Sequence, residues 1–158
     1  MRYLSGLLWR CAGVVLLVLA GATTAHAQVG WTVTDLGTLG GLFGDARDIN
    51  EAGHVVGEAS PVTGGDHAFL WTPSGGMVDL GTLGGAGSRS QAEGINDAGQ
   101  VVGLVNDGDD RAFYWTAADG MVGLPTLSGI ESGARAINNA GQLAGYGDIA
   151  TGDAHAVV

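Results

Sequence analysis

The sequence lacks the residues on which several large classes of protein depend. Its 158 residues contain one cysteine, Cys11, and no lysine. A disulfide framework within the chain is therefore excluded, and so is a thiol nucleophile after residue 11. A phosphate-binding loop is excluded as well, because it uses a lysine. The Gly-x-Ser-x-Gly and His-Glu-x-x-His motifs are also absent, so two common hydrolase signatures are missing.

Positive charge is scarce. After residue 27 the chain has four arginines against sixteen aspartates and glutamates, which gives a net charge of about −12. Such a surface repels phosphate backbones and anionic lipid heads, so we exclude nucleic acid as a partner. The densest acidic run is Asn106-Asp-Gly-Asp-Asp, with Asp148 and Asp153 in the corresponding loop downstream. An acidic surface turn and a calcium loop both fit this run, and we assign no metal or cofactor because a full calcium loop also needs a terminal bidentate glutamate.

The first 27 residues have the features of a secretory signal peptide. Arg2 and Arg10 give the N-terminal region a positive charge, residues 11–22 are apolar, and Ala25-His26-Ala27 is a small-x-small cleavage site. The apolar run is shorter than the roughly 20 residues that span a bilayer, which favours a cleaved signal over an uncleaved membrane tether. The sequence therefore predicts a secreted protein, extracellular or periplasmic, with no membrane span after cleavage and with Gln28 as its first mature residue.

One short motif occurs three times after the predicted signal peptide. It reads INEAGHVVG at residues 49–57, INDAGQVVG at 95–103 and INNAGQLAG at 137–145. Asparagine at the first corner of a type I turn, with glycine three positions later, is the chemistry of a tight hairpin. Each copy therefore predicts a strand, a turn and a second strand.

Two further motifs repeat with a period of 44 residues. HAFLWT at residue 67 corresponds to RAFYWT at 111 and to HAV at 155, while MVDLGTL at 77 corresponds to MVGLPTL at 121. The stretch TVTDLGTLGG, which begins at residue 32, resembles the motif at 77. We therefore divide the chain into a signal peptide (1–27) and one repeat domain (28–158), with repeats at about 33–76 and 77–120 and a partial third at 121–158.

The repeat is predicted to be all-β. The first unit contains four short strands, at residues 46–50, 54–59, 67–72 and 77–83, each bounded by turn residues, and we interpret the glycine-rich stretch 37–44 as a loop between units. Phe69 and Trp71 point to one face of their strand while Ala68 and Leu70 point to the other, so neither face is polar. Apolar faces on both sides indicate antiparallel sheets stacked between neighbours, as in propeller blades. A β-solenoid and an open β-sandwich are the alternatives.

The three motifs resemble the HAF family of extracellular repeat proteins, which are secreted by bacteria and named for the His-Ala-Phe triplet. The resemblance covers nearly all of the chain after the signal. It implies a secreted, β-rich, propeller-like repeat array with no assigned catalysis. Two positions depart from the pattern, since Arg111 stands where the second triplet has histidine and Val157 replaces phenylalanine in the third.

No residue is assigned a catalytic, cofactor-binding or metal-binding role. His67 and His155 are interpreted as strand-entry residues, because a histidine that exchanges with arginine makes a poor general base or metal ligand. Trp71 and Trp115 fit either a packed core or a sugar-stacking platform, and we favour the core. Trp31 is then the best exposed aromatic candidate.

The sequence therefore predicts a secreted, non-catalytic binding or structural module whose partner is an extracellular protein or a carbohydrate. The alternative is part of a propeller-type extracellular hydrolase or lyase whose active residues lie in further blades. Three incomplete blades cannot close a ring, since propellers have four to eight. We expect the chain either to belong to a longer reading frame or to associate with other copies through open blade edges.

Overall fold

The computed structural model describes residues 30–158 and confirms the all-β prediction. The described residues contain eleven strands in three antiparallel sheets and no helix. No helix that could cross a membrane occurs among them. The predicted signal peptide lies outside the described residues.

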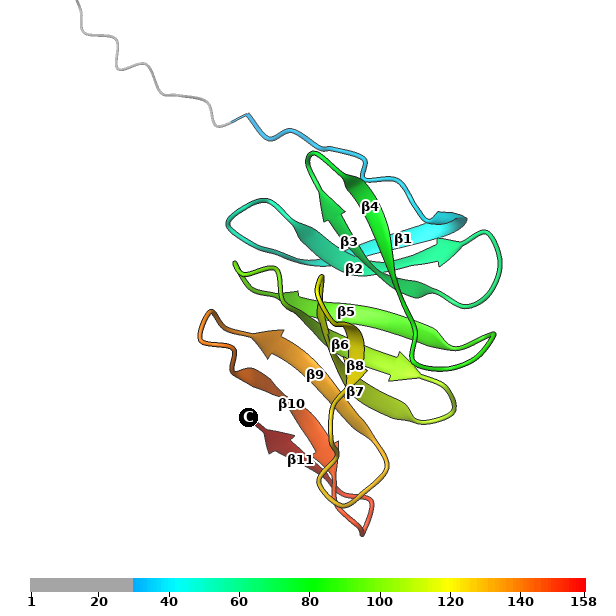
Figure 1. Ribbon diagram of the computed structural model, residues 1–158, viewed down its shortest axis with the longest axis vertical. Coiled ribbons are helices and arrows are strands. Elements are labelled where there is room, and N and C mark those ends of the chain that lie inside the picture. Colours follow the sequence, from blue (N-terminus) through cyan, green and yellow to red (C-terminus); the bar gives the residue numbers. More distant parts are fainter. Residues whose placement is uncertain (1–29) are drawn as a thin grey trace, which may run out of the picture. The chain divides into compact units, whose positions relative to one another are not determined.

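Each sheet is formed by strands that follow one another in the chain (Figure 1). The first sheet contains β1 (Gly40–Ile49), β2 (Val55–Pro61), β3 (His67–Thr72) and β4 (Gly76–Gly81). The second contains β5 (Arg89–Ile95), β6 (Val101–Asn106), β7 (Asp110–Thr116) and β8 (Gly120–Gly123). The third contains β9 (Ser132–Ile137), β10 (Leu143–Asp148) and β11 (Ala154–Val157).

The prediction for the strand at residues 67–72 is confirmed at both ends, but the prediction for residues 37–44 is wrong in part. The strand that we expected to begin at residue 46 begins at Gly40, so residues 40–44 belong to β1 and pair irregularly with β2. The glycines there allow a close approach of the two strands, because a Cβ on Gly41 would lie 2.6 Å from Cβ of Ser60. The glycines that suggested a loop therefore allow two strands to pack closely.

The asparagine turns form as predicted. In each copy the glycine amide donates to the asparagine carbonyl three residues earlier, as Gly53 does to Asn50 at 2.9 Å. Gly53, Gly99 and Gly141 have φ angles of 74°, 75° and 78°. Positive φ is costly for residues with a Cβ, so glycine is required at this corner.

The sheets pack face to face, as their two apolar faces indicated. The largest core cluster joins Val56, Ala68 and Leu80 of the first sheet to residues of the second, among them Val105 and Phe113. A separate cluster joins residues of the second and third sheets. The second sheet therefore lies between its neighbours with both faces covered.

The first strands of the second and third sheets contact the sheet before them along its first three strands. β5 contacts β1, β2 and β3, and β9 contacts β5, β6 and β7, whereas β4 and β8 contact each other only weakly. The approach of β5 to β9 is close, since a Cβ on Gly94 would lie 3.1 Å from Cα of Ala136. The small residues of these strands are therefore needed for the stacking.

The sheets are out of phase with the sequence repeats. β4 lies within the repeat that we begin at residue 77, yet it is the last strand of the first sheet. β8, which overlaps the start of the third repeat, is likewise the last strand of the second sheet. The second and third sequence repeats therefore begin with the fourth strand of the sheet before them.

Candidate functional site

The repeated asparagine both closes its own turn and bonds to the next sheet. Asn50 Oδ1 accepts hydrogen bonds from the amides of Ala52 and His54, at 3.1 and 2.9 Å. Its Nδ2 donates to the carbonyl of Asn96 at 3.0 Å, and Asn96 Nδ2 donates to the carbonyl of Asn138 at the same distance. The motif that marked a hairpin in the sequence thus also holds the three sheets together.

The last glycine of the motif is required by a close backbone contact. Gly57 lies opposite the bulge of β1, where a Cβ would come within 2.0 Å of the carbonyl oxygen of Asp45. Gly103 and Gly145 have the same contact in their own sheets, at 1.9 and 2.0 Å. No side chain fits there, so the fold requires glycine at this motif position.

His67 is part of a structural pair, in agreement with its interpretation as a strand-entry residue. Its Nδ1 donates to Asp79 on the neighbouring strand β4, at 2.9 Å from Oδ2. The pair therefore joins the His-Ala-Phe motif to the Asp-Leu-Gly motif of the same sheet. In the second sheet both members are replaced, by Arg111 and Gly123, and Arg111 pairs with Asp107 instead.

Serine hydroxyls add a second set of bonds between sheets. The amide of Ala68 in β3 donates to Ser90 Oγ at the start of β5, at 2.8 Å. The amide of Ala112 donates in the same way to Ser132 Oγ, at 3.0 Å. Both alanines and both serines are buried, so these bonds satisfy groups that water cannot reach.

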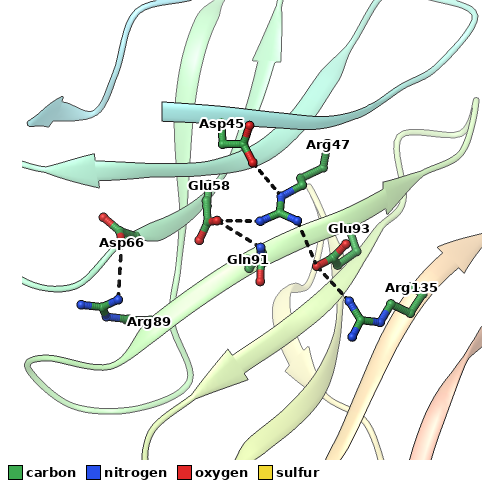
Figure 2. A network of polar contacts seen from close by, with 8 residues as sticks. All are labelled: Asp45, Arg47, Glu58, Asp66, Arg89, Gln91, Glu93 and Arg135. Carbon is green, nitrogen blue, oxygen red and sulfur yellow. Dashed lines mark hydrogen bonds and ion pairs between the residues drawn. The ribbon is translucent and has the colours of Figure 1, made fainter. Parts of the chain in front are cut away.

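A polar network crosses the first strands of the three sheets, as Figure 2 shows. Arg47, Glu93 and Arg135 occupy the same repeat position on β1, β5 and β9. Glu93 Oε1 lies 3.4 Å from Arg135 Nη1 and 3.9 Å from Arg47 Nη1, so one carboxylate links three sheets. On β1, β5 and β9 this position falls at the β-bulge, which turns its side chain out of the regular alternation.

Arg47 is the best-anchored member of this network. Its guanidinium contacts Glu58 Oε1 at 2.9 Å and Asp45 Oδ2 at 3.1 Å, and Gln91 Nε2 donates to the same Glu58 oxygen at 3.0 Å (Figure 2). The hydrogen bond to Glu58 raises the pKa of Arg47, while burial opposes that shift. Arg47 therefore stays charged and holds Glu58 in place.

The network borders an open cleft of about 580 Å³, which we call the polar cleft. Its lining is almost entirely polar and charged, and includes Glu58, Arg89, Gln91, Asp110 and Arg135. Of the three side chains at the bulge position, Arg135 is the most exposed. Its guanidinium lies 5.6 Å from the centre of the Tyr146 ring. Burial of Tyr146, with Asp110 beside its hydroxyl, raises the pKa of that phenol.

Sequence reasoning missed this cleft, although a signal was present. Aligning the three asparagine turns places Arg47, Glu93 and Arg135 at one repeat position. Opposite charges that alternate between copies, at a position next to invariant turn residues, indicate that the side chains meet across neighbouring units. The signal lies in the charges that differ between the copies, not in the residues that they share.

The acidic loop at residues 106–110 uses its side chains within the chain. Asn106 Nδ2 donates to Asp110 Oδ1 at 2.7 Å, and Asp107 pairs with Arg111. In the corresponding loop downstream, Asp153 accepts a bond from Thr151 Oγ1 at 2.7 Å. Over residues 30–158, no group of three or more histidine, cysteine, aspartate or glutamate side chains could hold a metal ion.

The tryptophans of the third strands belong to the packed core, as we favoured. Trp71 and Trp115 are partly buried against separate core clusters, whereas Trp31 is 92% exposed. A cavity of about 370 Å³ with a mainly apolar lining lies between the second and third sheets, bordered by Leu124, Ala134 and Val157. Val157 occupies the position that Phe69 and Phe113 fill in the other sheets.

Comparisons with protein-family models, curated proteins and solved structures found no match to the chain.

Proposed function

We propose that this chain is a secreted, non-catalytic module in which a propeller-like stack of sheets presents the polar cleft to an extracellular protein or carbohydrate. One observation carries the proposal. The motif residues that repeat between sheets are used in turns, close backbone contacts and bonds between sheets, as Asn50, Gly57 and His67 are. The residues that differ between sheets, such as Arg47 and Glu93, gather beside an open cleft.

The chemistry of the cleft suits a polar ligand. Arg135 and Arg89 supply guanidinium donors, Gln91 an amide, and Asp110 a carboxylate, within one concave surface. Arginine is enriched at protein interfaces because its planar group makes several hydrogen bonds at once. Amide and carboxylate groups bond equally well to sugar hydroxyls, so hydroxyl-rich and peptide ligands both fit.

The same contacts argue against catalysis in the cleft. A catalytic site needs an acid, a base and a stabilising group in one asymmetric arrangement, with at least one of them available to the substrate. Glu58 accepts bonds from both Arg47 and Gln91, and Glu93 lies between two arginines. These carboxylates are engaged in holding the sheets.

The test begins with the full chain expressed in a bacterial host. N-terminal sequencing of the product in the periplasm or the medium should find Gln28 first. That product is then presented to a panel of cell-wall and plant polysaccharides and to proteins of the culture medium, and any captured protein is identified and re-tested in pure form. We expect Arg135→Ala to weaken binding at least tenfold, because this exposed guanidinium contributes to the cleft.

The matched control is Asp119→Ala, which changes an exposed charge in the turn between β7 and β8, away from the residues that line the cleft. Binding that Arg135→Ala leaves unchanged would place the ligand elsewhere and contradict the proposal. Shortening of any polysaccharide by the wild-type chain would contradict its non-catalytic part.

A further inference from the structure

The few positive charges of the chain gather at the polar cleft. After residue 27 the chain has four arginines and sixteen acidic residues. Three of these arginines, Arg47, Arg89 and Arg135, belong to the network in Figure 2, and the last two also line the cleft. The fourth, Arg111, pairs with Asp107 and does not line it. The cleft is therefore where an otherwise acidic protein presents positive charge.

The two carboxylates that line the cleft are bonded within the protein. Glu58, whose side chain is 18% exposed, accepts from two donors of the network, and Asp110 accepts from Asn106 Nδ2 at 2.7 Å. The side chains of Arg135 and Arg89 are 57% and 67% exposed. A ligand that enters the cleft therefore meets guanidinium groups first.

Both arginines keep donors for a ligand. Arg89 Nη1 lies 3.7 Å from Asp66 Oδ2, which is too long for a hydrogen bond, and Arg135 Nη1 lies 3.4 Å from Glu93 Oε1. A guanidinium has five N–H donors in a planar fork that matches the two oxygens of a carboxylate. One long contact through a single nitrogen leaves most of this fork for a carboxylate of the ligand.

The third sheet holds Arg135 in place. Its guanidinium lies over the ring of Tyr146, on the neighbouring strand β10. Tyr146 is paired with Gly133 of β9, and a Cβ on Gly133 would collide with the ring. The first and second sheets have Asp45 and Gln91 at the position of this glycine. The third sheet therefore makes room for an aromatic ring that supports the guanidinium, and a guanidinium held in advance loses less entropy on binding.

The two arginines of the lining stand apart. Figure 2 shows Arg89 and Arg135 at opposite ends of the network, with Gln91 between them. Gln91 Nε2 donates to Glu58, so its amide oxygen remains as an acceptor. A ligand that contacts both arginines must therefore carry acidic groups at intervals along a chain, and a hydroxyl between them could donate to Gln91.

A peptide ligand would need a different kind of contact. Extended peptides are commonly recognised by pairing with an edge strand, and β5 is the first strand of its sheet. Two amides of this strand are already bonded to the first sheet, since Ser90 donates to the carbonyl of Asp66 and Ile95 to Asp48 Oδ2, both at 2.9 Å. The cleft therefore offers a ligand mainly side chains, which favours an acidic sugar over an acidic peptide.

We infer that the polar cleft binds an oligosaccharide of uronic acids, with Arg89 and Arg135 each bound to a carboxylate and Gln91 accepting from a hydroxyl between them. The inference rests on the proposed function, because it names the class of ligand for the same cleft. Duplex nucleic acid, with one charge per about 1.7 Å of its axis, stays excluded. A chain of uronic acids has one carboxylate per sugar, so the acidic protein repels it less.

Removing the charge of the ligand tests this inference directly. The full chain would be expressed in a bacterial host, and its exported product titrated by calorimetry with oligosaccharides of galacturonate, mannuronate and glucuronate. Each oligosaccharide would also be titrated as its methyl ester, which removes the charge and keeps the sugar chain. We expect at least one acidic form to bind at least tenfold more tightly than its ester.

Removing either arginine should have the same effect. Arg89→Ala and Arg135→Ala should each weaken binding of the acidic form at least tenfold, about the worth of one charge-assisted hydrogen bond, and should change binding of the ester much less. Arg135→Lys keeps the charge but lacks the planar fork, so it should restore only part of the affinity. Arg111→Ala is the matched control, because it removes the same charge outside the cleft, and it should leave the affinity unchanged.

Two further controls address folding and the class of ligand. Arg89 is largely exposed and its contact with Asp66 is long, so Arg89→Ala should give the circular dichroism spectrum and melting temperature of the wild type. Poly-glutamate carries the same acidic group on a peptide chain. It should bind at least tenfold more weakly than the best oligosaccharide.

The outcomes separate this inference from the proposed function. Equal affinity for the acidic form and its ester, with both lost in Arg135→Ala, would overturn the inference and leave the cleft as a binding site for neutral sugars. Tighter binding of poly-glutamate, or an equal loss in Arg111→Ala, would also overturn it. Binding that Arg89→Ala and Arg135→Ala both leave unchanged would contradict the inference and the proposed function together.

Discussion

The two junctions between sheets share their bonds but differ in their cores. Between the first and second sheets, Phe113 is fully buried in a continuous cluster. Between the second and third, Val157 stands at the corresponding position and a cavity of about 370 Å³ remains. The asparagine bond across each junction is nevertheless 3.0 Å. The turns and the first strands thus set the spacing of the sheets, and the core fills whatever space results.

The largest predicted effect comes from creating a cavity in the well-packed junction between the first and second sheets. Phe113→Ala should lower the free energy of unfolding by about 3–5 kcal/mol, because it removes a fully buried aromatic ring and leaves a cavity. Urea denaturation of the purified chain measures this. Val157→Ala is the matched control and should cost less than about 1.5 kcal/mol, since its side chain already borders a cavity. Equal losses would mean that the two junctions are equally well packed.

A smaller effect should follow from cutting the bond that both junctions share. Asn96→Ala removes two turn bonds, a bond to Gln100 and the donation to the carbonyl of Asn138. Asn138→Ala removes the corresponding turn bonds and a bond to Gln142, from an exposed side chain. We expect Asn96→Ala to cost about 1 kcal/mol more, the net worth of one hydrogen bond. Denaturation of dilute, monomeric chain measures the difference. Equal costs would show that the bond between sheets contributes nothing.

The sequence predicted local structure and stacking well. The asparagine turns, the strand at residues 67–72 and the apolar faces of each sheet all follow from turn chemistry and alternation, which depend on near neighbours in the chain. The role of His67 as a structural residue was inferred from its exchange with Arg111. Its partner, Asp79, was not, because strand pairing brings it across from another motif.

Other features could not be predicted because they depend on the third dimension. The network beside the polar cleft depends on β-bulges that turn Arg47 and Glu93 out of the regular alternation, and a strict period of two gives no sign of these bulges. Only the alternating charge at this repeat position indicates that the side chains meet. The start of β1 was missed because Gly40 and Gly41 indicate a loop by composition, while in the structure they allow close packing. Glycine can either favour a loop or allow two strands to pack closely, and the local sequence does not distinguish these two roles.

The measurement that tests the stacking most directly is amide hydrogen exchange of Ala68, Ala112 and Ala156 in monomeric chain. The first two amides are buried and bonded to serine hydroxyls of the next sheet, while Ala156, at the corresponding position, is exposed. The account predicts that Ala68 and Ala112 exchange only on global unfolding and that Ala156 exchanges much faster. Equally fast exchange at all three positions would contradict the packing of one sheet on the next.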